Sequence, residues 1–368
     1  MGISRAEFLG AAAALGGAVM LPASGVEASP RRRGLTYRGV VYEVGAGEAP
    51  ATAFDTTRMR RDMRAIRHQL HANSVKVTGH GVERLAATAT EAAERGLHVW
   101  LEPTLGDVPP AQILDHLAET GRCAERLRRQ GAGVHLSVGC EFVLFVPGIV
   151  PGDTVLERIE NLLSGNFDPE RLAVRLRRFT ARAAEVGRSV FGGPLTYAAA
   201  DDEDVDWDLF DIVGLDYYGY HQSRADYVRD LRRHQRPGKP LAIMEFGSCT
   251  FDGAPEQGGM GWNVVDYTKQ PPEIKGNLVR SERTQASYLT TVLDAFESMG
   301  LYSALAFTFI SPDAEHRAEP RYDLDMASYA LVKPIKERPG DPTSDWHWEP
   351  KQAFHALARA YHAQGRHS

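Results

Sequence analysis

Two glutamates in this 368-residue sequence each end an apolar run that is typical of a buried strand. Glu141 ends the run "HLSVGCE", and Glu245 is the fifth residue of "LAIMEF". An unpaired charge is costly at such a position, because a carboxylate that leaves water needs compensating partners. We therefore expect each glutamate either to have a structural partner, such as an arginine or a loop, or to take part in chemistry.

Whether the two glutamates lie close together depends on the secondary-structure elements to which they belong. Apolar runs rich in Val, Ile and Leu alternate along the chain with amphipathic stretches. In the first such stretch, at about 56–70, four apolar residues recur at helical spacing: Met59, Met63, Ile66 and Leu70. Strands are predicted at 37–44, 74–78, 98–103, 135–145, 195–199, 212–218, 241–246 and 303–310, and helices at about 56–70, 82–95, 110–130, 169–186, 224–234, 281–299 and 351–361.

This alternation predicts an α/β fold. Eight units in one chain of this length favour a closed (β/α)₈ barrel, formed by a single domain at 37–368 with long loops after the fourth, seventh and eighth strands. Barrel active sites lie at the C-terminal strand ends, so Glu141 and Glu245 would face each other across one mouth. An open doubly wound sheet is the alternative, but no GxGxxG or GxxxxGK[ST] loop follows the first strand.

Glutamates that end the fourth and seventh strands resemble those of clan A glycoside hydrolases. Two further segments carry the resemblance over most of the barrel. "DIVGLDYYGY" at 211–220 is similar to the sixth-strand signature of several families of this clan, and "WEPKQAFHALARAY" at 348–361 is similar to its final helix. The resemblance implies a retaining enzyme that cleaves a glycosidic bond in a polysaccharide or glycoconjugate, without a cofactor.

The same resemblance assigns roles to individual residues. Glu245 would be the nucleophile, Glu141 the acid/base, and Tyr217 or Tyr218 the hydrogen-bond donor to the nucleophile. The assignment agrees with the chemistry, because an oxocarbenium-like transition state needs a negative charge on one face and a proton on the leaving oxygen. A retaining enzyme holds the two carboxyl groups about 5 Å apart.

The sequence departs from the clan at two positions. Cys140 precedes the acid/base where the clan has an asparagine that binds a sugar hydroxyl, and a thiol is a weak donor and acceptor. The eighth strand carries Phe307 and Phe309 in place of a tryptophan. These departures leave open a catalytically inactive carbohydrate-binding barrel. A transglycosylase is a further alternative, since it differs only in the acceptor.

Several other polar and aromatic residues are candidates for substrate binding, each with a structural alternative. Glu102 ends the third strand and would bind a sugar hydroxyl, act as the acid or form an ion pair. Asp201 and Asp202 end the fifth strand and would face the sugar or cap a helical turn. Asp216 resembles an acid of the clan's sixth strand or forms an inward salt bridge. The remaining candidates lie in loops, where solvation or packing is the alternative: His80, Trp262, Trp346 and Trp348.

Composition narrows the possible partners. The net charge is −6, and the one dense basic run, at 31–33, is expected to be a solvated tail, so no nucleic-acid partner is predicted. Three cysteines form no disulfide framework. No CxxC, HExxH or strand-ending His-x-His pattern occurs, so no metal is predicted. The thirteen histidines keep a metal-dependent barrel hydrolase as a third alternative. The sequence does not determine the oligomeric state.

The N-terminus is typical of an export signal. "SRAEFL" at 4–9 precedes an Ala/Gly-rich apolar run at 10–21, and "VEA" at 26–28 offers a cleavage site after Ala28. The first part resembles a twin-arginine motif, although Ala6 stands at the second arginine position. We expect a signal peptide at 1–28, a linker at 29–36 and an exported protein, periplasmic or extracellular, with no other membrane segment. An uncleaved anchor or a frayed terminal helix is the alternative.

Overall fold

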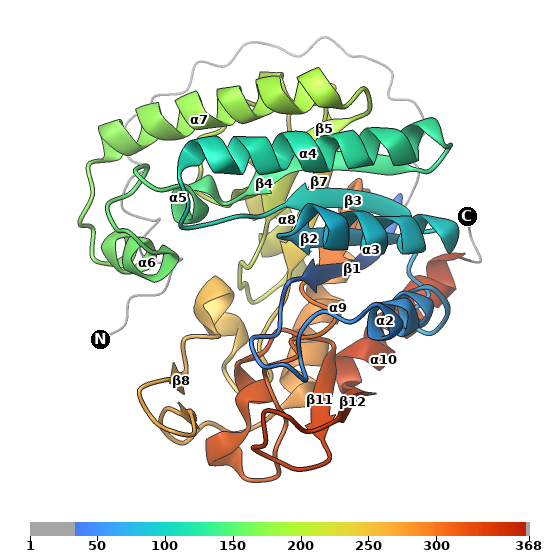
Figure 1. The fold of residues 1–368 in the computed structure, drawn as a ribbon, viewed down its shortest axis with the longest axis vertical. Helices are drawn as coiled ribbons and strands as arrows, with labels where there is room; N and C mark the ends of the chain where they lie inside the picture. Colours follow the sequence, from blue (N-terminus) through green and yellow to red (C-terminus); the bar gives the residue numbers. More distant parts are fainter. Residues whose placement is uncertain (1–33, 366–368) are drawn as a thin grey trace.

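The computed structural model describes residues 34–365. Eight parallel strands close into a barrel, and their order around the barrel follows the chain (Figure 1). The predicted (β/α)₈ fold is therefore confirmed. The barrel strands are β1 (Tyr37–Val44), β2 (Ser74–Gly79), β3 (His98–Pro103), β4 (Val134–Cys140), β5 (Leu195–Ala200), β6 (Val213–Asp216), β7 (Leu241–Phe246) and β10 (Ser303–Ala306).

Helices surround the barrel and bury their apolar faces against it (Figure 1). Local signals in the sequence set several of their ends. The side chain of Asp55 accepts a hydrogen bond from the Arg58 N–H and begins the first helix, while Gly300, with φ of 62°, ends the helix before β10. The helices are α2 (Thr56–His68), α3 (Val82–Glu94), α4 (Pro110–Arg129), α7 (Pro169–Val190), α8 (Arg224–Arg232), α9 (Glu282–Met299) and α10 (Gln352–Gly365).

Aromatic and imidazole rings fill the barrel at its N-terminal end. Tyr37, Trp100, His135 and Tyr302 lie within 6.0 Å of one another by ring centroid, and His98 contacts the same group. Burial lowers the pKa of His98 to about 3 and that of His135 to about 4, so both rings are neutral at pH 7. The polar interior residues that matter for chemistry lie above this layer, toward the C-terminal strand ends.

The chain after β4 differs from the prediction. The strand was expected to run to residue 145, but it ends at Cys140, and α5 (Phe142–Phe145) follows Glu141. The apolar run "FVLF" alone does not distinguish a strand from a buried helical turn. The Pro/Gly-rich insertion at 147–168 contains α6 (Val155–Leu163), which begins with a capping box between Thr154 and Glu157.

Two other barrel strands are shorter than expected, because the chain leaves the sheet after Asp216 and after Ala306. The long loops that follow β7 and β10 contain small antiparallel pairs: β8 (Val265–Asp266) with β9 (Glu273–Ile274), and β11 (Val332–Lys336) with β12 (Trp346–Pro350). Within residues 34–365, no helix has the length and apolar character needed to cross a bilayer. The predicted signal peptide at 1–28 lies outside the described residues and stays a prediction.

Candidate active site

A cavity of about 930 Å³ opens at the C-terminal ends of the barrel strands. Glu141 and Glu245 both line it, together with residues that follow most of the other strands. The barrel therefore brings the two predicted carboxylates to one cavity. Glu141 also acts electrostatically on Glu245, since its charge is among the influences that raise the pKa of Glu245.

Glu141 occupies an unusual backbone conformation. Its φ of 35° and ψ of 56° lie in the left-handed region, where a residue with a Cβ atom is strained by about 1 kcal/mol. Its N–H donates to the carbonyl of Ala198 at 2.9 Å, which continues the β4–β5 pairing. The left-handed turn ends the strand at the carboxylate and starts α5 directly after it.

The side chains of Tyr197 and Glu203 accept hydrogen bonds from the backbone of this turn. The Phe142 N–H donates to the Tyr197 hydroxyl oxygen at 2.6 Å, and the Val143 N–H donates to Glu203 Oε1 at 3.0 Å. The Tyr197 hydroxyl in turn donates to Glu203 Oε2 at 2.6 Å. These bonds satisfy N–H groups at the start of α5, which have no partner within the helix. The position of Glu141 is thus fixed by contacts to β5 and to the loop that follows it.

Glu245 lies in a second hydrogen-bond network. The Tyr218 hydroxyl donates to its Oε2 at 2.7 Å, and Lys76 Nζ donates to its Oε1 at 2.7 Å. Lys76 also pairs with Glu102 Oε1 at 2.8 Å, and Thr78 donates to the same oxygen at 3.0 Å. The side chains of Lys76 and Glu102 are fully buried, whereas 12% of the Glu245 side chain is exposed. Only Glu245 of the three reaches the cavity.

The charges of this network have opposite effects on the pKa of Glu245. Burial raises its pKa, the Lys76 ammonium lowers it, and the charge of Glu102 raises it again. Burial also disfavours the ammonium form of Lys76, but the surrounding carboxylates Glu102, Glu245 and Asp216 outweigh it and raise the lysine pKa well above its usual range. Lys76 therefore stays charged and is the cation that offsets the burial of Glu245.

Two further carboxyl groups line the cavity near Glu245. Asp216 is 3% exposed, and neither of its oxygens has a hydrogen-bond partner within the described residues. Burial and the charge of Glu245 raise its pKa well above the usual range, which favours the neutral acid. Burial and the charge of Glu245 also raise the pKa of Glu43, to about 7.

The structure distinguishes the two predicted tyrosines. Tyr218 donates to Glu245, but the Tyr217 hydroxyl donates to Asp230 Oδ2 at 2.9 Å, and Tyr217 packs in the core against α8 and α9 residues such as Tyr227 and Phe296. Tyr217 does not line the cavity. The expectation that it faces the substrate is wrong, because neighbouring residues of an extended segment point to opposite sides.

The two tyrosines provide a matched pair of variants. Tyr218→Phe should lower kcat about 10- to 100-fold on a glycoside that the protein cleaves, because it removes one of the two donors to Glu245. Tyr217→Phe should leave kcat unchanged and lower the free energy of unfolding by about 1–3 kcal/mol, since Asp230 loses a donor. Steady-state kinetics and urea unfolding of both variants check this. Equal kcat values for the two variants would contradict the assignment.

The other predicted substrate-binding residues divide into two groups. Cys140, His80 and Trp262 line the cavity as expected. Glu102 lies beneath the cavity and accepts a hydrogen bond from Lys76. Asp201 pairs with Arg233 and His234 instead, while its neighbour Asp202 lines the cavity.

The two tryptophans of β12 lie outside the cavity, contrary to expectation. Trp346 Nε1 donates to the Ala51 carbonyl at 2.7 Å, and the Arg58 guanidinium lies 4.3 Å from its ring centroid. Trp348 Nε1 donates to Asp62 Oδ1 at 2.8 Å. Both rings therefore serve packing and hydrogen bonding between the last loop and the α2 region.

Sequence reasoning missed Lys76 and Glu43. Each is a single charged residue inside an apolar strand, in "SVKVT" and "VVYEV" respectively. A charge at an inward position of such a run must be paired or functional, so the signal was present in the sequence.

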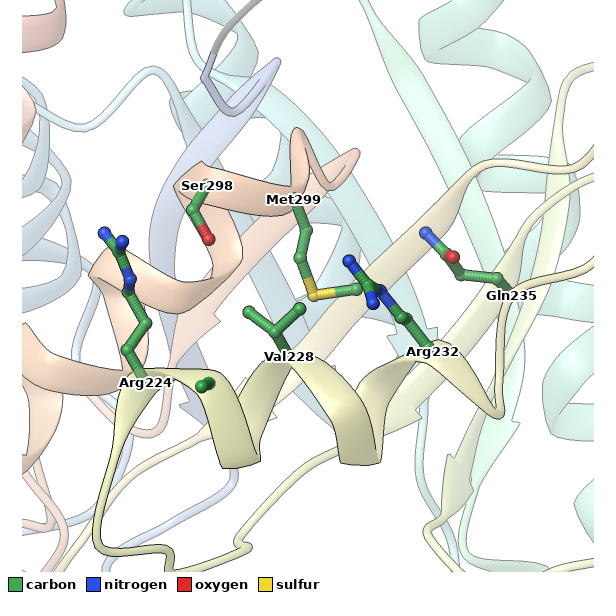
Figure 2. Close-up of a pocket in the computed structure, with 7 residues that line it drawn as sticks. Arg224, Val228, Arg232, Gln235, Ser298 and Met299 are labelled. Carbon is green, nitrogen blue, oxygen red and sulfur yellow. The ribbon is translucent and has the colours of Figure 1, made fainter.

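Two other groups of residues in the described chain have a composition that could suggest a site. A smaller cavity of about 410 Å³ lies outside the barrel between α8 and α9, where Val228 and Met299 face each other and Arg224 and Arg232 flank them (Figure 2). No carboxyl group lines this cavity, so it offers no pair of carboxyl groups for glycoside cleavage.

His316, Asp323 and Asp325 also lie close together, with donor atoms within 4.8 Å of one another. Arg280 pairs with both aspartates, at 2.9 and 2.8 Å, and Lys351 pairs with Asp325 at 3.2 Å. With two cations already on these carboxylates, the group is a structural ion-pair cluster.

Comparisons with known proteins extend the description of the fold. No protein-family model and no curated protein matches the sequence. Among solved structures, the GH113 beta-mannanase AaManA from Alicyclobacillus acidocaldarius is similar over 89% of this chain and 98% of its own, with a TM-score of 0.55 and 16% identity. A GH113 beta-1,4-mannanase matches 89% of this chain and 99% of its own, with a TM-score of 0.58 and 13% identity.

A third similar structure is a calcium-binding mutant of Bacteroides uniformis beta-glucuronidase 2. It covers 89% of this chain at a TM-score of 0.55 and 16% identity, and the match spans 35% of the longer protein. At these identities the similarity establishes a shared fold. The resemblance to (β/α)₈ glycoside hydrolases is thus confirmed for the architecture.

Proposed function

We propose that this protein is a retaining glycoside hydrolase in which Glu245 is the nucleophile and Glu141 the acid/base. The observation that carries the proposal is one cavity that holds both carboxylates, at the ends of β4 and β7, with Lys76 and Tyr218 bonded to Glu245. The fold shared with solved glycosidases supports the same reaction class.

The residues can divide the reaction into two displacements. In the first, the Glu245 carboxylate attacks the anomeric carbon, and Glu141 gives its proton to the departing glycosidic oxygen. In the second, Glu141 takes a proton from water, the water oxygen attacks the same carbon, and the ester bond to Glu245 breaks. Lys76 and Tyr218 hold Glu245 ionised and oriented between the two steps.

The charges around the cavity favour a neutral sugar over an anionic one. Carboxyl groups of Glu43, Glu48, Asp107 and Asp202 line it besides the catalytic pair and Asp216, whereas no Lys or Arg of the described chain does. Recognition of a sugar carboxylate uses a cation, most often an arginine. One of the structural neighbours is a glucuronidase, but this cavity has no cation placed for a uronic acid.

A pair of substrates that differ only at C6 tests this point. A 4-nitrophenyl glycoside that is cleaved should become about 10³-fold worse in kcat/KM, or more, when its hydroxymethyl group is replaced by a carboxylate, because like charges repel in a poorly solvated site. Release of nitrophenol measures both rates. Comparable rates on the two substrates would exclude the proposed preference.

The function itself is tested by trapping the intermediate. Incubation with activated 2-deoxy-2-fluoro glycosides of several neutral sugars should add one glycosyl mass to the protein, and peptide mapping should place it on Glu245. NMR of a cleaved substrate should show that the first product keeps the anomeric configuration of the substrate. Label on another residue, or inversion of configuration, would refute the assignment.

A catalytically inactive carbohydrate-binding barrel remains the second candidate, and Cys140 is the observation that favours it. Its thiol lines the cavity directly before Glu141 and lies 3.6 Å from the Thr104 hydroxyl oxygen. Burial raises its pKa well above the usual range, so it is a neutral, weak hydrogen-bond partner for a sugar. Glycan binding without turnover by the unmodified protein would support this candidate.

A further inference from the structure

One face of α6 presents aliphatic side chains to the active-site cavity. Val155, Ile159 and Leu163 recur at every fourth position, so they form a single stripe along the helix, and all three line the cavity. We call these three residues the α6 stripe. None of them belongs to the hydrophobic core of the described chain, and each is partly exposed. By contrast, Leu156 points away and is 58% exposed.

A buried arginine fixes the stripe relative to Glu141. Arg158 is fully buried, and its Nε donates to the Leu144 carbonyl of α5 at 2.5 Å. Its other nitrogens donate to the Gly152 carbonyl at 3.0 Å and pair with Asp107. Since α5 follows Glu141 directly, these bonds tie α6 to the acid/base side of the cavity. Figure 1 shows α5 and α6 side by side there.

Two side chains of α5 extend the same wall. Leu144 and Phe145 line the cavity between Glu141 and the α6 stripe. A sugar ring in this position would bring hydroxyl groups against aliphatic side chains that offer no donor or acceptor, and unpaired polar groups are costly there. An aliphatic chain would instead bury apolar surface on both partners.

We propose that the leaving group of the substrate is apolar, an alkyl or acyl chain as in a glycolipid, and that it binds against the α6 stripe. The inference rests on the proposed function, because the acid/base protonates the glycosidic oxygen and therefore lies beside the leaving group. It selects a lipid glycoconjugate over a polysaccharide as the substrate class. The cavity then binds a neutral sugar at Glu245 and a chain of methylenes at α5 and α6.

A homologous series of substrates tests the inference. Methyl, butyl, hexyl and octyl glycosides of a neutral sugar that is cleaved should show kcat/KM rising about twofold to fourfold per methylene until the stripe is covered. The octyl glycoside should also exceed the disaccharide of the same sugar. A flat series, or a preference for the disaccharide, overturns the inference while the covalent label on Glu245 would still support the proposed function.

Variants of α6 test whether the dependence of kcat/KM on chain length comes from the α6 stripe. Ile159→Asn and Leu163→Asn should abolish the dependence on chain length, so that kcat/KM no longer rises from the methyl to the octyl glycoside. Leu156→Asn, at an exposed position of the same helix that does not line the cavity, should keep the full dependence. Val155→Thr changes shape least and should weaken the dependence even if the asparagine variants unfold. If Leu156→Asn abolished it equally, the stripe would not be the binding surface.

Binding to an inactive protein separates the two proposals. Calorimetry with the Glu245→Gln variant should show tighter binding of the octyl than of the methyl glycoside, whether or not the unmodified protein is catalytic. Equal affinities overturn the inference. Octyl preference without any turnover or label retains the apolar subsite and refutes the hydrolase.

Discussion

Glu245→Gln should lower kcat on a cleaved glycoside by about 10⁴-fold or more, the effect of removing a covalent nucleophile. The amide has nearly the shape of the carboxylate, but its single oxygen accepts from only one of Tyr218 and Lys76. Urea unfolding of the variant therefore accompanies the kinetics and separates lost chemistry from lost folding. Asp201→Asn is the matched control, since Asp201 lies outside the cavity and pairs with Arg233. It should keep the wild-type kcat.

A companion variant tests the other carboxylate. Glu141→Ala should slow substrates with poor leaving groups far more than activated ones, because only the former need a proton on the departing oxygen. Azide should restore turnover of an activated substrate and give a glycosyl azide, since this anion attacks without a general base. Retention of a tenth or more of the activity by Glu245→Gln, or failure of azide to rescue Glu141→Ala, would contradict the assigned roles.

Lys76→Met should lower the free energy of unfolding by about 3–5 kcal/mol, because it leaves Glu102 and Glu245 without their shared buried cation. It should also raise the pKa of Glu245, which Lys76 lowers in the native protein. In the proposed mechanism the ionised form of Glu245 is the nucleophile, so activity should fall as pH drops through its pKa. The acid limb of the pH–rate profile should therefore move to higher pH.

A double variant distinguishes the loss of the Lys76–Glu102 ion pair from a simple packing defect at residue 76. Lys76→Met with Glu102→Gln removes the second buried charge and should recover part of the lost stability. The acid limb should also return part of the way to lower pH, because the charge of Glu102 raises the pKa of Glu245 in the native protein. Urea unfolding and pH–rate profiles of the single and double variants measure the two effects. An additive loss of stability would show that the Lys76–Glu102 contact contributes nothing.

The sequence predicted the barrel and the meeting of two glutamates at one cavity, because both depend on strongly local signals. Buried parallel strands are apolar on both faces, so a Glu at the end of such a run stands out, and strand order around the barrel follows chain order. Glu141 and Glu245 could therefore be placed at one mouth without any tertiary information.

Side-chain direction was harder to predict, since it depends on register and on where a strand ends. A bulge between Leu215 and Asp216 shifts the pairing of β6 with β7, and the strand ends there. Alternation from an inward Asp216 would nevertheless have selected Tyr218 over Tyr217. The same uncertainty at the end of β5 left Asp201 and Asp202 undistinguished in the prediction, and only Asp202 lines the cavity.

The arrangement of the loops could not be predicted, because it depends on long-range contacts. Trp346 and Trp348 belong to a hairpin that packs on the α2 side, through bonds to Ala51 and Asp62 nearly 300 residues earlier in the chain. Helix α6 is different, since its capping box at Thr154 and Glu157 was visible in the sequence.

The rings that fill the N-terminal end of the barrel determine the route by which molecules enter and leave the cavity. Trp100 and its neighbours close that end, so substrate, both products and the attacking water all use the mouth above Glu245. A long aliphatic alcohol that dissociates slowly from α6 would then stand between bulk solvent and the glycosyl ester. Turnover of long-chain substrates would be limited by departure of the lipid, with a pre-steady-state burst whose amplitude equals the enzyme concentration.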